Sequence, residues 1–495
     1  MMLDAPRLKW VPHLTHLRVD VMRRMDLLKH MASPNWGASS RFLRLFYCAF
    51  IRAKIDYGSV LYGTASSSQL KRLEILQNAC LRLILGARRT TPLMSLHVEA
   101  HVPPLSLRRS YLTASMYIRL KYRPNGDRTS VVVLGDAPSA LQCGSQILHD
   151  LGLPFCRGYP TPVFDPVPPW RCLSSLICLD FQSSSEVATP CLFTAHLDAK
   201  YPNHRAIYCD GSKFLDGPST SCGLYVPSRK QAAAWRLNPA HSVLSAELIA
   251  ILQALRLIEI DSFPEWVICS DSLVALRLLQ SPTGTCCNLV HGIRELLLRL
   301  NDSKSVHLQW VKAHTGIVGN ERADAAAKLG HHLHHSALFP LPCSDALAML
   351  WSCFLSFWEL DWVSAVATDG RGYHLASIRS RLSPVPWIAS HPCRISVVLT
   401  RLCLGHVGVR SYLHCFGMAD TPMCLQCGVE ETIEHFLLIC ALYDHERQVM
   451  ASSINALGVP HISVRVLLGG GNYPRRVQHF IVRATAALAY EESWT

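Results

Sequence analysis

The sequence of 495 residues lacks the features that would place it outside the cell or within a membrane. It has no N-terminal signal peptide, and no apolar run reaches the ~18 residues that a membrane-spanning helix needs. Its 20 cysteines follow no disulfide-framework spacing, which is typical of reduced thiols. We therefore expect an intracellular protein without a membrane partner, and the sequence does not decide between nucleus and cytoplasm.

Acidic residues are scarce at the N-terminal end of the chain. Residues 1–125 contain 20 Lys and Arg but only 6 Asp and Glu, a net charge of +14, whereas the remaining residues sum to −2. Charge localised in this way indicates a polyanion held by one end of the molecule. The alternative is that the charge serves only solubility, and this explanation is weaker because the excess charge is confined to one region.

Between residues 204 and 332, short apolar runs alternate with amphipathic segments. Apolar residues at three- and four-residue steps predict a helix over 241–260, with Ser242 or Ser245 as its N-cap. Asn320 is predicted to cap the last helix, over 321–329. The remaining pattern predicts strands at 205–214, 221–226, 231–237, 266–269 and 306–311, and helices at 273–279 and 289–300.

Four acidic residues stand where these strands end or on the faces of these helices. Such a placement can gather separate carboxylates into one pocket for hard, oxygen-preferring metal ions. A solvated surface charge is the alternative for each residue taken alone. The four are Asp210 in Tyr-Cys-Asp-Gly-Ser, Glu247 in Leu-Ser-Ala-Glu-Leu, Asp271 in Cys-Ser-Asp-Ser, and Asp324 in Gly-Asn-Glu-Arg-Ala-Asp.

This stretch resembles type I ribonuclease H. The resemblance implies a ribonuclease H-like α/β domain, with a mixed five-stranded sheet and flanking helices, within a multidomain protein. It also implies an endoribonuclease that cleaves the RNA strand of RNA–DNA hybrids by two-metal-ion hydrolysis and needs no small-molecule cofactor. Five motifs follow in the order of that family: Asp210-Gly-Ser, Glu247, Asp271-Ser, Trp310-Val-Lys-Ala-His314 and Asn320-Glu-Arg-Ala-Asp324.

The resemblance also implies a role for each acid. Asp210 would bridge two Mg²⁺ (or Mn²⁺) ions, with Glu247 and Asp271 on one ion and Asp324 on the other. Two such ions about 4 Å apart stabilise the attacking and leaving oxygens of a phosphodiester and lower the pKa of the attacking water.

Two further residues are implied to assist. His314, on a Gly-containing loop, would shuttle a proton or help the product leave, and a surface histidine without a role is the alternative. Asn320, together with Glu247, is expected to contact 2′-hydroxyl groups of the nucleic acid. Some family members carry an extra basic helix where this chain has only residues 281–288, so affinity for the hybrid must come from elsewhere.

The basic N-terminal region has the three- and four-residue periodicity of a helical bundle. It resembles the thumb-like region that follows the palm in reverse transcriptases of non-LTR retrotransposons. The chain has no Asp-Asp pair for the metal-binding turn of such a polymerase, so we do not expect it to polymerise. The motifs are Leu8-Lys-Trp-Val-Pro-His, Lys54-Ile-Asp-Tyr-Gly-Ser, Leu76-Gln-Asn-Ala-Cys-Leu-Arg and Gly86-Ala-Arg-Arg-Thr-Thr-Pro.

A second metal motif lies near the C-terminus. Cys424-Leu-Gln-Cys427 is followed after seven residues by His435 and after four more by Cys440. A Cys-x₂-Cys turn presents two thiolates to one tetrahedral ion, and four ligands without an open position predict one structural zinc. Buried thiols beside a core histidine are the alternative. The spacing resembles the knuckle of non-LTR retrotransposon polyproteins, which implies binding of RNA or single-stranded nucleic acid.

Together these observations predict the C-terminal part of a retrotransposon-derived polyprotein that carries an active hybrid ribonuclease. The alternative is a catalytically silent nucleic-acid-binding protein from a truncated element, since the domain would then lack the partner that positions its substrate. The expected domains are a basic thumb-like region (1–125), a Pro/Ser-rich linker (126–203), the ribonuclease H domain (204–332), a helical connector (333–413), a zinc knuckle (414–445) and a helical tail (446–495).

Overall fold

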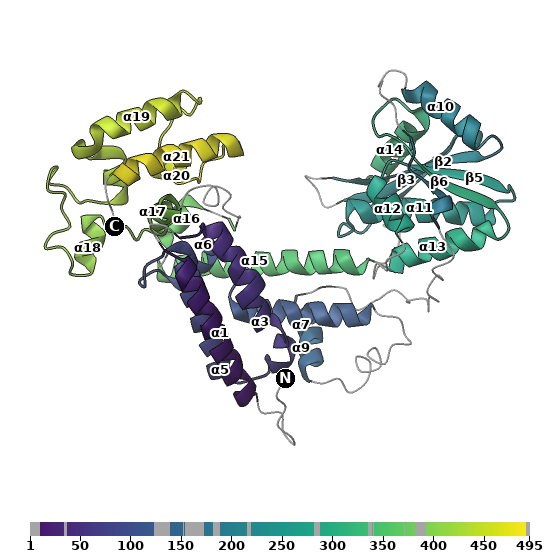
Figure 1. Cartoon of the computed structure of the whole chain (residues 1–495). Helices are drawn as coiled ribbons and strands as arrows, with labels where there is room; N and C mark the ends of the chain where they lie inside the picture. Colours follow the sequence, from purple (N-terminus) through teal and green to yellow (C-terminus); the bar gives the residue numbers. More distant parts are fainter. Residues whose placement is uncertain are drawn as a thin grey trace. The chain divides into compact units, whose positions relative to one another are not determined.

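The computed structural model divides into two compact units, shown in Figure 1. The sheet unit is Ala114–Trp351, and the helical unit combines Met1–Thr113 with Ser352–Thr495. The helices α7 (Leu105–Lys121) and α15 (Cys343–Asp369) each contribute residues to both units. The structure describes residues 10–33, 37–122, 139–151, 153, 173–181, 189–214, 219–281, 288–334, 339, 341–370, 372–379, 381–382 and 393–491.

The sheet unit is built on a mixed sheet of six strands in the order β1-β6-β5-β2-β3-β4. β2 pairs antiparallel with β3, which pairs antiparallel with β4, whereas β5, β6 and β1 are added in parallel. The strands are β1 (Ile177–Cys178), β2 (Arg205–Lys213), β3 (Thr220–Val226), β4 (Gln231–Leu237), β5 (Glu265–Ser270) and β6 (Ser305–Trp310).

Both faces of this sheet are covered by helices (Figure 1). Alternate residues of a strand point to opposite faces, and Ile207 and Cys209 accordingly belong to one core cluster while Tyr208 belongs to another. The first cluster lies under α11, α12 and α13, and the second lies under α10 and α14. The helices of the unit are α9 (Ser139–Asp150), α10 (Thr189–Lys200), α11 (Val243–Ile260), α12 (Leu273–Gln280), α13 (Asn288–Asn301) and α14 (Val318–Gly330), with short 3₁₀ turns at Leu173–Ser175 and Pro227–Arg229.

The sheet differs from the five-stranded prediction because it gains β1. This strand and the helices α9 and α10 come from the segment 126–203, in which we expected little regular structure. β1 is only two residues long and owes its strand character to pairing with β6, where Ile177 lies opposite Leu308. The clustered prolines of that segment and residues 282–287 lie outside the described residues.

The predicted N-cap of α11 is confirmed, since the Ser242 hydroxyl accepts a hydrogen bond from the Ser245 N–H at 3.2 Å. The prediction for Asn320 is wrong. α14 begins at Val318, so Asn320 lies inside its first turn, and its side chain turns toward the carboxylates instead of the helix end.

The helical unit brings together segments from both ends of the chain. Val98 of α6 shares one core cluster with Trp358 and Trp362 of α15 and with Phe436 and Leu437 of the C-terminal region. Its N-terminal elements are α1 (Val11–Met31), α2 (Ser40–Phe46), the π-helix Tyr47–Arg52, α3 (Ala53–Asp56), α4 (Ser59–Tyr62), α5 (Ser67–Leu85) and α6 (Leu93–Ala100). Its C-terminal elements are α16 (Tyr373–Ile378), α17 (Cys393–Leu404), α18 (Arg410–Cys415), the π-helix His435–Ile439, the 3₁₀ turn Ala441–Tyr443, α19 (Asp444–Asn455), α20 (Val464–Leu467) and α21 (Arg475–Glu491).

A buried ion pair adds to this joint core. Arg379 donates to both carboxylate oxygens of Glu99, with Nη1–Oε2 at 2.5 Å and Nη2–Oε1 at 3.3 Å. Both side chains are at least 95% buried. Removing one partner of such a buried pair would leave an uncompensated charge, so this ion pair ties the N-terminal helices to the C-terminal segment that supplies Arg379.

Helix α15 departs from the expectation that no segment is apolar enough to cross a membrane. By length and composition, Cys343–Thr368 is long and apolar enough. The averaged hydropathy is high although the segment contains Asp345, Glu359 and Asp361, which interrupt any continuous apolar run. Trp358 and Trp362 of this helix are each only 1% exposed, but just 28% of its apolar window is buried within the part of the chain that the structure describes.

Candidate functional site

Three of the predicted acids meet at one edge of the sheet. Asp210 lies in β2, Glu247 lies near the start of α11, and Asp271 directly follows β5. One carboxylate oxygen of each lies within 4.8 Å of the others. β2 and β5 are parallel neighbours with Cys209 opposite Ser270, so the residues that follow this pair, Asp210 and Asp271, come out at the same level.

Gly211 allows Glu247 to reach this edge. A Cβ atom at position 211 would lie 2.5 Å from the backbone nitrogen of Glu247, which is closer than any side chain tolerates. The first turns of α11 therefore rest directly on β2, and this contact brings the Glu247 carboxylate beside Asp210. The Asp-Gly-Ser motif thus combines a ligand with the space that its partner needs.

The fourth acid, Asp324, lies on α14 at the margin of the cluster. It is outside the set of three within 4.8 Å, but its charge is close enough to raise the pKa of Asp210. Its Oδ2 accepts a hydrogen bond from Lys328 Nζ at 2.6 Å. Lys328 was missed by the sequence analysis, although its position four residues after Asp324 on a helix is a recognised signal for an ion pair.

Close contacts between α14 and the sheet fix the place of Asp324. A Cβ atom at Gly223 would lie 2.3 Å from the backbone nitrogen of Ala327. The Ser221 hydroxyl donates to the Ala327 carbonyl at 2.6 Å. The helix is therefore held against β3 by a glycine and a side-chain hydrogen bond, one turn beyond Asp324.

The clustered carboxylates are an unfavourable set of charges. Burial raises the pKa of Asp210, and the charges of Asp271 and Asp324 raise it further. Burial, followed by Asp210 and Asp271, likewise raises the pKa of Glu247. Glu247 Oε2 is buried and has no hydrogen-bond partner among the described residues. An oxygen-preferring divalent cation would satisfy this oxygen and offset the repulsion, so the three residues fit such an ion.

Asn320 orients Asp271 in the structure. Its Nδ2 donates to Asp271 Oδ2 at 3.1 Å, and burial raises the pKa of Asp271 while this hydrogen bond and nearby His314 lower it. The preceding Gly319 permits the position, because a Cβ there would lie 2.2 Å from the Tyr208 ring. Asn320 Oδ1 is buried without a hydrogen-bond partner in the part of the chain that the structure describes.

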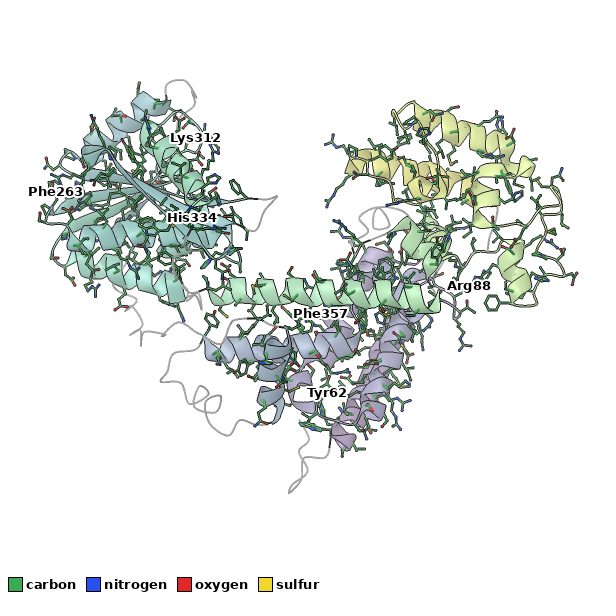
Figure 2. The ribbon with its side chains drawn as sticks, turned by 180° about the vertical axis from the view of Figure 1, so that it is seen from behind. Tyr62, Arg88, Phe263, Lys312, His334 and Phe357 are labelled. Atoms are coloured by element: carbon green, nitrogen blue, oxygen red, sulfur yellow. The ribbon has the colours of Figure 1, made fainter. Side chains whose placement is uncertain are left out.

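His314 lies on the exposed loop between β6 and α14. Its φ of 53° is in the left-handed region, and Thr315 stabilises the turn by donating to the Lys312 carbonyl at 2.9 Å. Lys312, labelled in Figure 2, marks the end of the sheet from which this loop leaves. Trp310 of the same motif, the last residue of β6, donates from Nε1 to the Asp271 carbonyl at 3.2 Å and so ties the end of β6 to the residue that follows β5.

The predicted cysteine and histidine ligands also meet, within the helical unit. One ligand atom from each of Cys424, Cys427, His435 and Cys440 lies within 4.8 Å of the others. Cys440 Sγ is 3.8 Å from the sulfurs of both Cys424 and Cys427. Zn–S bonds of about 2.3 Å at tetrahedral angles place two sulfurs about 3.8 Å apart. The cluster could therefore hold zinc.

The local chain explains how these four side chains converge. Gly428 has a φ of 68°, and its N–H donates to the Cys424 carbonyl at 2.9 Å, which closes the Cys-x₂-Cys turn. Cys440 N–H donates to the His435 carbonyl at 2.7 Å at the end of the π-helix. Both ring nitrogens of His435 are buried without a hydrogen-bond partner among the described residues. A histidine so placed fits a metal ligand better than an ordinary core residue.

The comparison with known families bears on the sheet unit. Residues 202–332 match the RNase H family. The match spans β2 to β6 and α11 to α14 and includes all four acids, His314 and Asn320. It begins after β1 and α10 and leaves the cysteine–histidine cluster outside. The chain thus contains an RNase H domain, a type of domain that acts on RNA–DNA hybrids with divalent metal ions.

Proposed function

We propose that this RNase H domain is an active endoribonuclease that cleaves the RNA strand of RNA–DNA hybrids with two divalent metal ions. The observation that carries the proposal is the convergence of Asp210, Glu247 and Asp271 within 4.8 Å inside the matched domain. Three unrelated surface acids would have no reason to meet in a buried cluster with raised pKa values.

Asp210, Glu247 and Asp271 would hold the metal, and Asp324 would complete the set. When bound, Mg²⁺ or Mn²⁺ stabilises charge on the attacking and leaving oxygens. Asn320 keeps Asp271 in position through its 3.1 Å hydrogen bond. Lys328 holds Asp324 at the margin.

His314 would shuttle a proton at the proposed site or help the product leave. Its exposed position on the β6–α14 loop lets its imidazole take up a proton near Asp271 and release it to water. Gly316, with a φ of 79°, and the hydrogen bond from Thr315 to the Lys312 carbonyl shape the loop that presents His314.

The remaining parts of the proposal concern the rest of the chain. Cys424, Cys427, His435 and Cys440 would hold one structural zinc in a knuckle that binds RNA or single-stranded nucleic acid. Some family members bind the hybrid through an extra basic helix, in whose place this chain has only residues 281–288. The basic helices of residues 1–125 would supply that affinity for nucleic acid here. The whole would belong to an intracellular non-LTR retrotransposon polyprotein.

A cleavage assay on the purified chain tests the enzyme. We expect Mg²⁺-dependent cleavage of the labelled RNA strand of a hybrid and no cleavage of duplex DNA. Glu247→Gln should abolish cleavage, because the buried carboxylate is lost from the cluster. Glu295→Gln is the matched control, since it makes the same change on an exposed face of α13.

Binding without cleavage would identify the silent alternative. Its mark is a salt-dependent gel shift with the hybrid and no product in either Mg²⁺ or Mn²⁺. Equal activity of the Glu247→Gln and Glu295→Gln variants would instead refute the assignment of the site while leaving a nuclease elsewhere in the chain.

A further inference from the structure

A pocket in the helical unit gathers arginines that have no acidic partner. Its volume is about 290 Å³, close to the lower end of small-ligand pockets. Arg82 of α5, Arg89 of the following loop and Arg401 of α17 line it together with the apolar side chains Leu43 and Val397. The N-terminal helices and α17 therefore build this pocket jointly.

These arginines lack an acidic partner among the described residues, whereas six other arginines of the same unit each pair with an acid. None of Arg82, Arg88, Arg89 and Arg401 makes an ion pair with a residue that the structure describes, and the Nε atoms of Arg82 and Arg88 are buried without hydrogen-bond partners there. Guanidinium groups stay protonated, so their repulsion calls for an anion. Elsewhere in the unit the pairs are Arg24–Asp20, Arg52–Asp56, Arg108–Asp56, Arg109–Glu74, Arg379–Glu99 and Arg447–Asp444.

A purely structural role explains only part of this cluster. Arg401 Nε donates to the Gly86 carbonyl at 3.0 Å and so caps the end of α5. Gly86 itself is required there, because a Cβ would lie 2.7 Å from the Val397 side chain. This hydrogen bond uses one of the five N–H groups of Arg401, and it accounts for neither Arg82 nor Arg89.

An aromatic row begins beside the pocket. The loop that carries Arg89 also carries Arg88, which lies 5.9 Å from the Tyr412 ring, and Thr90, whose hydroxyl contacts both His406 Nδ1 (2.9 Å) and Tyr412 Oη (2.7 Å). The Tyr412 ring lies 4.9 Å from that of Phe416, which is 47% exposed. Arg88 is labelled in Figure 2, where the N-terminal helices meet the C-terminal segment.

We propose that the arginine pocket binds a phosphate of a nucleic-acid strand whose neighbouring base stacks on the Tyr412–Phe416 row. Arginines match the geometry of phosphate oxygens, and the apolar walls strengthen their attraction. A positive groove beside aromatic rings is the arrangement by which proteins hold single strands. The pocket lies outside the carboxylate cluster and is independent of the proposed cleavage.

Binding of a labelled single-stranded DNA, measured by anisotropy over a range of salt, tests this proposal. A ribonuclease does not cleave such DNA, so a failure here leaves the proposed cleavage untouched. We expect the R82Q/R89Q double variant of the full chain to bind at least about tenfold more weakly. The slope of log affinity against log salt should fall by about 0.7 per lost phosphate contact.

The matched control is R18Q/R23Q, which removes two positive charges from exposed positions on α1 of the same unit. R82K/R89K keeps both charges and should retain the salt slope, which separates loss of charge from loss of folding. Equal weakening in R82Q/R89Q and R18Q/R23Q would overturn the proposal, because the pocket would then contribute only general charge.

Inorganic pyrophosphate distinguishes the source of the phosphate. Suppose that pyrophosphate raises the melting temperature of the unaltered chain but not that of R82Q/R89Q, and that both proteins bind DNA with equal affinity. The pocket would then be a phosphate site, and its assignment to a nucleic-acid strand would be wrong. Competition between pyrophosphate and DNA that disappears in R82Q/R89Q would support the assignment.

Discussion

The two candidate metal sites of this chain are assembled in opposite ways. The carboxylate site draws Asp210 from β2, Glu247 from α11 and Asp271 from the residue after β5, far apart along the chain. The cysteine–histidine site takes all four ligands from residues 424–440. Like charges face one another in the first site, whereas Cys424 and Cys440 belong to an apolar core in the second.

The difference in assembly indicates that one site serves catalysis and the other serves folding. A cluster of repelling carboxylates costs folding free energy and is retained where a cation and a reaction use it. A closed set of thiols and an imidazole within a core instead contributes to folding. We therefore expect that altering the first site removes activity while sparing the fold, and that altering the second does the reverse.

The largest effect is expected from Asp210→Asn. Cleavage of the hybrid should fall by several orders of magnitude, because a central ligand is lost. The metal-free sheet unit should melt at an equal or higher temperature, since burial and the neighbouring acids already raise the pKa of Asp210 and its charge disfavours the fold. Single-turnover cleavage measures the first effect, and calorimetry without Mg²⁺ measures the second. A wild-type cleavage rate in Asp210→Asn would refute the catalytic role of the carboxylate site.

Cys440→Ser should destabilise the helical unit by several kcal/mol through loss of zinc. Because Cys440 shares its core cluster with Val98 and Trp358, hydrogen exchange should speed up in α6 and α15 as well as near residue 440. Cys415→Ser, at an exposed cysteine of α18, is the control. Unchanged zinc content and melting temperature in Cys440→Ser would show that the cluster consists only of buried thiols.

The stabilisation of the sheet unit by Mg²⁺ should grow with pH. Asp210, Glu247 and Asp271 have raised pKa values in the folded, metal-free protein. Above about pH 4, the pKa of an ordinary carboxyl group, the folded protein therefore binds more protons than the unfolded chain. Its stability therefore falls as pH rises through that window. Mg²⁺ should raise the melting temperature more at about pH 8 than at about pH 5. Equal increases at the two pH values would contradict the clustering of the three carboxylates.

The smallest effect is expected from Asn320→Ala. Losing its hydrogen bond to Asp271 should lower kcat by about tenfold. The acidic limb of the pH profile should move to higher pH, because that hydrogen bond lowers the pKa of Asp271. Steady-state kinetics across pH measure this, and a change confined to KM would instead assign Asn320 a contact to the nucleic acid.

The sequence predicted much of the sheet unit because its signals are local. Period-two and period-3.6 patterns located β2 to β6 and α11 to α14 within a few residues. The helices α9 and α10 were missed because the Pro-, Ser- and Gly-rich composition of residues 126–203 predicted a linker. β1 was missed because a two-residue strand has no periodicity of its own and forms by pairing with β6. The role of Asn320 was missed for the same reason, since Asp271 is a partner that folding brings near, whereas Lys328 stands four residues after Asp324 and so carried a local signal.

The sequence by itself determined which residues carry chemistry. Ligand spacing within residues 424–440 is short enough for the chain's own turns to close the cluster, and the five ordered motifs identified the acids. Only the tertiary structure decided that three carboxylates converge while Asp324 stays with Lys328, and that both ends of the chain share one core through Glu99 and Arg379. Contacts between distant segments depend on packing, which no local pattern encodes.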